Sequence, residues 1–279
     1  MTTSPVQKVD AETWIEDLSI CDALLTAPPG CGKTEHLARR AGMLVRSGQV
    51  REPRQILALT FSNKAKANLR TRLERELGST YWRQVCVMNF HGLGLRLLRH
   101  HGPVIGRRSE AVLGPQRGSL RSLRRQICDE FRIAADELDD LIRHAKSGSY
   151  SDSEVLERLA GSPAALAYET ALRRDGRIDH DDAIRLGLLI VRNPSIEELY
   201  RRRFVCLLVD EVQDLSMPQF ELISGLGLGR TVFAGDRAQG IYGFAGAAPR
   251  RSTRRLRHVR NKKSHSKPPT DRPQTSWPS

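Results

Sequence analysis

The apolar residues of this chain fall into short runs separated by longer amphipathic stretches. Runs at 55–61, 85–88, 204–209 and 231–236 predict strands, the last together with its turn, and another apolar segment lies at 23–26. The run at 204–209 is partly β-branched, which is typical of a strand covered on both faces. These runs predict a buried sheet.

Helical periodicity follows most of these runs. Helices are expected from 33 to about 47, from 63 to 77, from 90 onward and from 216 to about 226. One face of the second helix is apolar at every fourth position: Ala65, Leu69, Leu73 and Leu77. Its basic residues lie mainly elsewhere, and a solvated basic face is their simpler interpretation. Repeated strand and helix units predict an α/β fold with a parallel sheet.

The strand signals disappear between about residue 102 and residue 198. The apolar spacing there indicates packed helices, at Leu120, Leu123, Ile127, Phe131 and Ile133. The strand pattern resumes at Phe204. We therefore expect an all-helical insertion at 102–198, which divides the α/β domain into segments 1–101 and 199–249.

Composition separates a folded part from a basic tail. The 279 residues are 39% hydrophobic, enough for a sizeable core. The net charge is +13, but residues 250–279 hold ten Lys and Arg and one acid, while the preceding part holds 35 basic and 31 acidic residues. We expect this tail to be disordered. The overall charge therefore argues only weakly for DNA binding by the folded part.

Two further features exclude some protein classes. The five cysteines are scattered and lack paired spacing, so neither a disulfide framework nor a zinc site is indicated. No run approaches the roughly 20 apolar residues that cross a bilayer, and the polar start lacks a secretory signal pattern. We expect no membrane association and a cytoplasmic location.

A glycine-containing loop follows the apolar segment at 23–26. Its residues resemble a Walker A phosphate loop, with alanine at the first position: Ala27, Pro28, Pro29, Gly30, Cys31, Gly32, Lys33 and Thr34. The glycines allow several N–H groups to approach one phosphate chain, and the following helix N-terminus favours negative charge. Lys33 would contact the β and γ phosphates of ATP, and the Thr34 hydroxyl would bind Mg²⁺.

Two acids end the apolar run at 204–209. An isolated Asp-Glu pair is most often solvated, but the phosphate loop upstream favours a functional interpretation. Asp210 would lie at the carboxyl end of a strand and hold Mg²⁺ through water. Glu211 would orient the water that attacks the γ phosphate and accept its proton.

Taken in order, the segments resemble the first half of a UvrD/Rep-type superfamily 1 DNA helicase. Six motifs carry the resemblance: APPGCGKT at 27–34, LTFSNKAKANLRTRL at 59–73, FHGLGLRLLR at 90–99, IDHDDAI at 178–184, LLVDEVQDLSMPQFELI at 207–223 and AGDRAQGIYGFAGA at 234–247. The resemblance implies a RecA-like P-loop NTPase domain whose helical insertion corresponds to subdomain 1B. It also implies ATP-driven movement on single-stranded DNA, usually 3′ to 5′, with ATP between two RecA-like domains.

The resemblance assigns further residues by motif. Gln239 would sense the γ phosphate and link hydrolysis to movement. Phe61 and Phe244 match aromatic residues that meet DNA bases, and Asn63 and His91 match positions near the path of the strand. Stacking on aromatic rings is a sequence-tolerant way to hold a single strand.

Some positions depart from the family pattern. Glu35 replaces the arginine often found after the threonine of the phosphate loop, and Ala245 stands where many relatives have arginine. Only 32 residues follow Ala247, so we expect a truncated or frameshifted chain whose second RecA-like domain comes from a partner, if at all. A catalytically incomplete accessory module that binds ATP and DNA, and a gene remnant, remain alternatives. Repair, recombination and defence against foreign DNA are all open.

Overall fold

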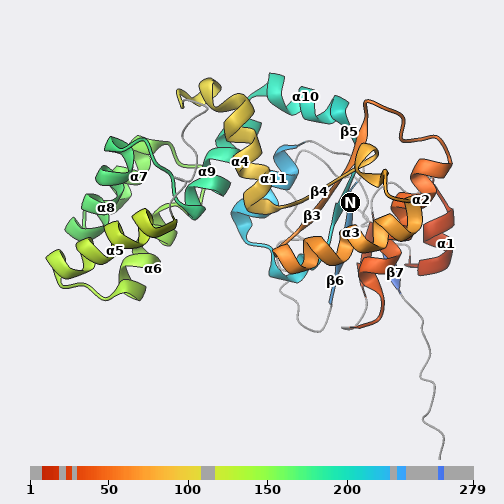
Figure 1. The fold of residues 1–279 in the computed structure, drawn as a ribbon, viewed down its shortest axis with the longest axis horizontal. Helices are drawn as coiled ribbons and strands as arrows, with labels where there is room; N and C mark the ends of the chain where they lie inside the picture. Colours follow the sequence, from red (N-terminus) through yellow and green to blue (C-terminus); the bar gives the residue numbers. More distant parts are fainter. Residues whose placement is uncertain are drawn as a thin grey trace, which may run out of the picture.

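The computed structural model describes residues 8–18, 23–26, 30–107, 117–226, 231–236 and 257–260. Its long axis joins two regions, a sheet covered by helices and a separate lobe of helices (Figure 1). None of the helices among these residues is long and apolar enough to span a membrane.

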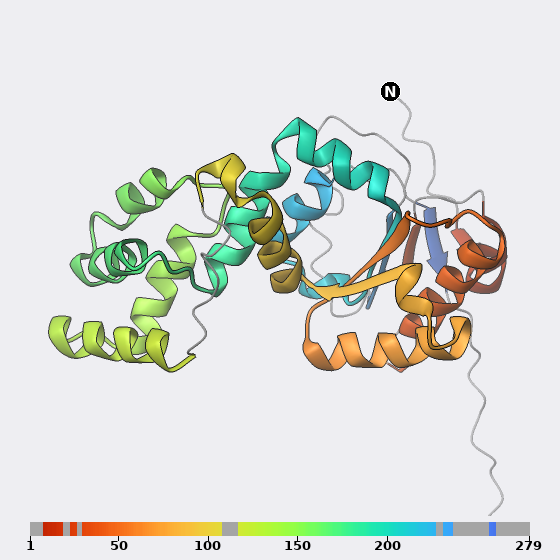
Figure 2. The same cartoon turned by 45° about the horizontal axis from the view of Figure 1, so that its top comes forward.

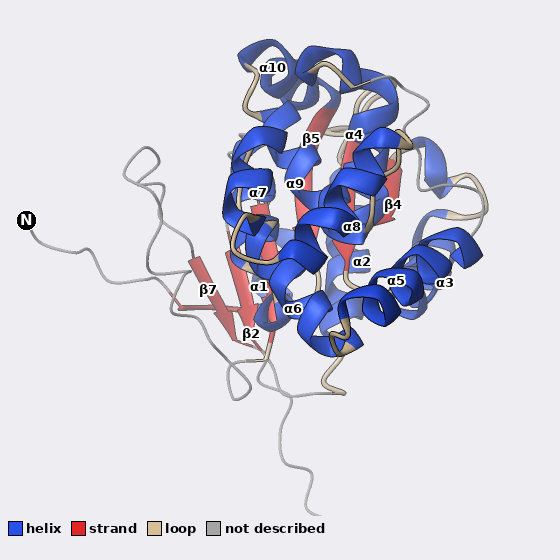
Figure 3. Cartoon of the chain, turned by 90° about the vertical axis from the view of Figure 1, so that its left-hand side faces the viewer, coloured by secondary structure: helices blue, strands red, loops and turns tan. Residues whose placement is uncertain are grey.

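The described strands form one parallel seven-stranded sheet in the order β1-β7-β2-β6-β5-β3-β4. Their bounds are β1 Lys8–Asp10, β2 Ala23–Thr26, β3 Gln55–Thr60, β4 Val85–Asn89, β5 Phe204–Val209, β6 Thr231–Gly235 and β7 Arg257–Arg260. Figure 3 shows β7 and β2 toward one side of the sheet and β4 toward the other. The predicted α/β class with a parallel sheet is confirmed.

The strand β7 differs from the expectation for the tail. Residues 250–279 were expected to be disordered throughout, but Arg257–Arg260 pairs in parallel with β1 and β2. Charge composition missed these four residues, because strand pairing satisfies backbone groups whatever the side chains carry. The other residues of the expected tail lie outside the described residues.

Helices cover both faces of the sheet or form the lobe. Their bounds are α1 Ala11–Glu16, α2 Lys33–Arg46, α3 Asn63–Leu77, α4 Phe90–His101, α5 Arg117–Phe131, α6 Ala135–Ala145, α7 Asp152–Leu159, α8 Pro163–Arg174, α9 His180–Val191, α10 Pro194–Arg203 and α11 Met217–Gly225. Short 3₁₀ turns lie at η1 Tyr81–Arg83, η2 Gly102–Ile105 and η3 Val212–Asp214.

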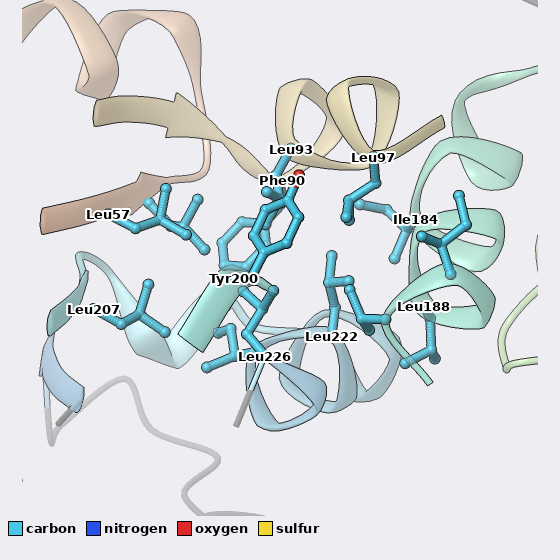
Figure 4. Packing of buried hydrophobic residues seen from close by; sticks show 14 of the residues in the cluster. Leu57, Phe90, Leu93, Leu97, Ile184, Leu188, Tyr200, Leu207, Leu222 and Leu226 are labelled. Atoms are coloured by element: carbon cyan, nitrogen blue, oxygen red, sulfur yellow. The ribbon is translucent and has the colours of Figure 1, made fainter. Parts of the chain in front are cut away.

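Alternate residues of the central strands enter different hydrophobic clusters. In β3, Ile56 and Ala58 pack with α2 and α3, whereas Leu57 and Leu59 pack with α4, α9 and α11. Successive side chains of a strand point to opposite faces of the sheet, so a continuously apolar strand must be covered by other residues on both faces. Figure 4 shows the second cluster, in which Leu57 and Leu207 of the sheet lie among residues of these helices.

The helical region from 102 to 198 packs in two parts. Helices α5–α8 surround a separate cluster that includes Leu138, Val155 and Tyr168. The apolar residues of α9 and α10, among them Leu188, belong instead to the cluster on the sheet. In Figure 2 α9 lies between the lobe and the sheet, beside α4, and α10 runs on from α9 toward β5. The lobe with its own core therefore comprises α5–α8, a smaller unit than the expected insertion.

Close backbone contact joins α4 to α9. A Cβ added at Gly94 would collide with the backbone carbonyl of Ala183, and one added at Gly187 would lie 3.1 Å from the Cα of Gly94. Glycine at both positions therefore allows the two helices to approach closely.

Candidate functional site

The carboxyl ends of the parallel strands meet at one edge of the sheet and surround a pocket of about 740 Å³. Three segments supply its walls: the loop after β2, the start of α3, and the turn after β5. Its lining residues are Gly30, Gly32, Lys33, Thr34, Phe61, Ser62, Lys64, Ala65, Asn68, Arg72, Glu211, Gln213 and Asp214. The structure thus brings the expected phosphate loop next to the expected catalytic acid.

The loop has the backbone form that its glycines permit. Gly30 and Gly32 have φ values of 77° and 76°, in the left-handed region that other residues rarely adopt. A Cβ at Gly30 would meet no atom within 4 Å, so conformation and not space requires glycine there. Lys33, 6% exposed, opens α2 directly after this loop. Ala27, Pro28 and Pro29 lie outside the described residues.

Thr34 and Asp210 are in direct contact. The Oγ1 of Thr34 donates a hydrogen bond of 2.7 Å to Oδ2 of Asp210, which is 3% exposed. Burial raises the pKa of Asp210, and the neighbouring Glu211 adds to this, while Thr34 and Lys33 oppose it. A hydroxyl and a carboxylate oxygen side by side at the pocket form a donor set that suits Mg²⁺.

Glu211 leaves the strand in an unusual conformation. Its backbone is left-handed, with φ 53° and ψ 49°, and its N–H donates 3.1 Å to Oδ1 of Asp210. Few non-glycine residues adopt this conformation, and strained residues cluster at functional sites. The turn directs Asp210 toward Thr34 while the Glu211 side chain lines the pocket.

Gln213, a residue to which the motifs assigned no role, lies beside Glu211. Its Nε2 donates 2.7 Å to Oε2 of Glu211, and its Oε1 accepts 3.0 Å from the backbone N of Asp236. Asp236 is buried directly after β6. The amide therefore joins the pocket carboxylate to the neighbouring strand. The sequence placed Gln213 two residues after Glu211, which could have suggested a contact between the two side chains. It did not reveal the second contact, with Asp236 after β6.

Arg72 is a second residue without an assigned role. Its guanidinium reaches from α3 to the carboxylate of Glu35 on α2 and lines the pocket. The acid that follows the loop threonine is therefore paired with a cation from another helix. The two side chains are 28% and 38% exposed, so the pair contributes little to folding stability.

The expected DNA-contacting residues divide into two groups. Phe61 and Asn63 lie at the carboxyl end of β3, where the Phe61 ring packs on Phe90 with centroids 5.1 Å apart. His91 lies in the first turn of α4 and packs edge-on against His180, with ring centroids 5.4 Å apart, so that the motifs at 90–99 and 178–184 meet. Burial, and to a lesser degree His180, lowers the pKa of His91. Phe244 and Gln239 lie outside the described residues.

A buried cluster at the junction of the lobe and α9 has the spacing of a metal site. The carboxylates of Glu169, Asp179 and Asp182 lie within reach of one another. The Nζ of Lys146 lies among them, at 2.8, 2.8 and 2.9 Å, and Arg185 also pairs with Asp182. The Lys146 ammonium and the guanidinium groups of Arg173 and Arg185 together offset the charge of the three carboxylates, and the cluster is an ion network that holds the lobe to α9.

Comparisons with known proteins agree with the geometry. The model of the UvrD/REP helicase N-terminal domain matches residues 18–256. The chain is 29% identical to the ATP-dependent DNA helicases PcrA of Leuconostoc citreum and Rep of Escherichia coli (strain K12), and 32% identical to UvrD1 of Mycobacterium leprae (strain TN). The matches cover 80%, 81% and 80% of this chain but 32%, 35% and 32% of those proteins. The chain therefore spans about a third of their length.

Proposed function

This chain belongs to the UvrD/Rep helicase family, and we propose that it binds Mg-ATP and couples ATP hydrolysis to movement on single-stranded DNA, 3′ to 5′. The supporting observation is the contact of Thr34 with Asp210 beside Glu211 in a pocket that the phosphate loop opens. A loop lysine, a hydroxyl, a metal-binding carboxylate and a second carboxylate are the groups that nucleotide hydrolysis requires.

The phosphate chain is held by the loop and by α2. Gly30 and Gly32 leave the backbone accessible, and Lys33 places an ammonium at the pocket. The first N–H groups of α2 and its dipole favour the negative phosphates. Thr34 and Asp210 would hold Mg²⁺, which neutralises charge on the β and γ phosphates when bound.

Glu211 acts as the general base in this proposal. A carboxylate within hydrogen-bond reach of a water can orient it toward the γ phosphate and accept its proton. Gln213 holds one oxygen of this carboxylate at 2.7 Å, which leaves the other oxygen for the water. Gln213 is therefore a positioning residue, because it acts through Glu211.

The DNA strand is proposed to cross the carboxyl edge of the sheet. Phe61 and Phe244 would stack on bases, and Asn63 and His91 would line the path of the strand. Gln239 would sense the γ phosphate and link hydrolysis to movement along the DNA. Phe61 follows β3 directly and Asn63 begins α3, at the edge that carries the nucleotide pocket. Nucleotide-dependent movement at this edge can thus reach the DNA. The cytoplasm remains the proposed location, since both proposed ligands occur there.

PcrA, Rep and UvrD1 are about three times as long as this chain, so their helicase activity is itself part of the proposal. We propose that a second RecA-like domain, in the same polypeptide or in a partner, closes the other side of the nucleotide. Its arginines would stabilise the charge that develops during hydrolysis, an effect worth about 10³–10⁵-fold in related hydrolases.

ATP hydrolysis with and without single-stranded DNA tests the proposal. We expect the wild type to hydrolyse ATP faster with DNA, and Lys33→Ala to lose this rate, because it removes the phosphate-binding ammonium. Equal background rates for the two proteins would reject autonomous hydrolysis. DNA and nucleotide binding without hydrolysis would instead indicate an accessory module, and neither binding nor hydrolysis would indicate an inert remnant.

A further inference from the structure

A second groove, of about 460 Å³, runs along the edge of the sheet that β4 forms. Among the described strands β4 pairs only with β3, so its outer side faces this groove. The lining residues come from α3, η1, β4 and α4: Lys66, Arg70, Tyr81, Trp82, Val85, Cys86, Val87, Met88, Asn89, Gly92, Leu95, Arg96, Arg99 and His100. Phe61, Asn63 and His91 are not among them.

The groove is positively charged and has no acidic residue among its described lining residues. Lys66 and Arg70 enter from α3, and Arg96 and Arg99 enter from α4. None of the four forms an ion pair within the described part of the chain, whereas Arg72, two residues after Arg70, pairs with Glu35. The basic side of α3, which the pattern alone favoured as a solvated face, is thus one wall of a groove that attracts anions.

An exposed aromatic residue lies at one end of the groove. Trp82 is 59% exposed, with Tyr81 next to it among the lining residues. The guanidinium carbon of Arg83 lies 5.5 Å from the centre of the Trp82 ring. A large exposed ring on a basic surface is the combination that holds single-stranded nucleic acid, because any base can stack on it.

The other end of the groove reaches the proposed DNA path. Asn89 lines the groove, and its Nδ2 donates 3.2 Å to Oδ1 of Asn63. The strand from Val85 to Asn89 extends about 13 Å at the usual rise per residue. The groove therefore continues from the carboxyl edge of the sheet, where Asn63 lies, toward Trp82.

We propose that this groove is an additional binding site for single-stranded DNA, continuous with the path over Phe61 and Asn63. Lys66, Arg70, Arg96 and Arg99 contact phosphates, and Trp82 stacks on a base. The proposal rests on the proposed function, because it extends the same DNA strand. The positive charge of the groove would also attract an acidic peptide, but an acidic peptide has no base to stack on the exposed Trp82 ring.

Binding of the full chain to a fluorescent oligothymidylate, measured by anisotropy at several salt concentrations, tests the site. Trp82→Ala should weaken binding about 5-fold to 150-fold, the effect expected for one stacked base, and Trp82→Phe should restore most of it. Arg96→Ala with Arg99→Ala should reduce the slope of log K against log salt by about 0.7 for each phosphate that the variant no longer neutralises. The charge-matched control is Arg121→Ala with Arg125→Ala, two exposed positions on α5, which should keep the wild-type slope.

A second measurement separates local effects from misfolding and from the basic tail. Binding of a fluorescent ATP analogue should be unchanged in every groove variant, since the nucleotide pocket is separate. Photo-crosslinking with iodouracil-substituted DNA should label Tyr81 or Trp82. Crosslinks confined to residues 250–279, or groove variants that bind DNA as the α5 control does, would overturn the proposal while leaving the proposed function intact.

Two other outcomes would also overturn it. If polyglutamate displaces DNA from the wild type and Trp82→Ala changes nothing, the groove is an acidic-protein site. If the wild type binds no single-stranded DNA at all, the proposed function fails together with the groove.

Discussion

The side-chain amide of Gln213 bridges Glu211 and the end of β6. Its Nε2 lies 2.7 Å from Oε2 of Glu211, and its Oε1 lies 3.0 Å from the backbone N of Asp236. An amide with both ends bonded cannot rotate without breaking one hydrogen bond, so it fixes the orientation of the carboxylate. It also ties that carboxylate to the strand that precedes Gln239 in the sequence.

Gln213→Ala is expected to lower kcat for ATP about 10-fold or more while leaving nucleotide affinity nearly unchanged. A hydrogen bond to a charged group contributes about 1.5–3 kcal/mol, and here it orients the proposed base. Steady-state kinetics with a nucleotide-binding titration separates the two effects. Gln219→Ala is the matched control, because Gln219 accepts 3.0 Å from Ser216 N at the start of α11 and should affect only stability. If Gln213→Ala has the kcat of the wild type, Gln213 does not position Glu211 for catalysis.

Glu211→Gln is expected to bind ATP and to hydrolyse it about 10²–10⁴-fold more slowly. The substitution removes the proton acceptor but keeps an oxygen that can accept from Gln213. Single-turnover hydrolysis beside a binding titration measures both quantities. Glu221→Gln, at a residue of α11 whose side chain is 44% exposed, should leave turnover unchanged. Near-normal turnover in Glu211→Gln would reject this residue as the base.

Thr34→Val should weaken the apparent affinity for Mg²⁺ in ATP hydrolysis, whereas Thr34→Ser should preserve it. Valine has a similar shape but removes the hydroxyl that donates to Asp210 at 2.7 Å, and this hydrogen bond lowers the pKa of Asp210. We expect the magnesium concentration for half-maximal rate to rise about 10-fold, as for the removal of a hydrogen bond to a charged group. The check is a magnesium titration at fixed ATP. Identical curves for valine and serine would contradict the proposed ligand set.

Lys146→Met is expected to destabilise the protein by about 3–5 kcal/mol, because it leaves buried carboxylates without their cation. The Nζ contacts Glu169, Asp179 and Asp182 and is fully buried. Urea denaturation measures the change in the free energy of unfolding. Arg143→Ala, which breaks an exposed ion pair with Asp140, should cost less than about 1 kcal/mol. Similar destabilisation by both variants would show that the buried network contributes no more to the free energy of unfolding than an exposed ion pair does.

The same network makes stability depend on pH. Burial would raise the pKa of Asp182, but Lys146 and Arg185 lower it to about 2. The native state therefore favours the ionised form of Asp182, so the contribution of Asp182 is present above about pH 4 and is lost as the pH falls toward 2. Burial and the neighbouring Asp182 instead raise the pKa of Asp179, to about 6. In Lys146→Met the carboxylates protonate more readily, so the stability difference from the wild type should shrink in acid. A constant difference between neutral and acid pH would contradict this account.

Gly94→Ala is expected to destabilise the protein by about 1–3 kcal/mol or more, because its Cβ would collide with the carbonyl of Ala183 and push α4 from α9. Thermal unfolding gives the change. Gly161→Ala is the control, since a Cβ there meets no atom within 4 Å, and its effect should be within about 0.5 kcal/mol. A tolerated Gly94→Ala would show that the helices can separate without cost.

The local elements could be predicted because each depends on neighbouring residues. The apolar run at 204–209 is β5 and the four-residue spacing at 63–77 is α3, with the expected bounds. The fold class followed from the repeated strand and helix units and the family from motif order, and both are confirmed. The limits of the helical lobe could not be predicted, because α9 and α5–α8 have the same periodicity and differ only in what they pack against.

The sequence by itself determined the central strands and the helices that follow them, the phosphate loop and the two acids after β5, because periodicity and motif spacing are local properties. Only the tertiary structure decided which residues meet. Gln213 faces Asp236 because β6 lies next to β5, and Lys146 meets Asp179 because the lobe folds against α9. The groove between α3 and α4 exists because β4 is at the edge of the described sheet. Strand order and helix packing bring residues that are distant in the sequence together, and no local sequence pattern encodes that order or that packing.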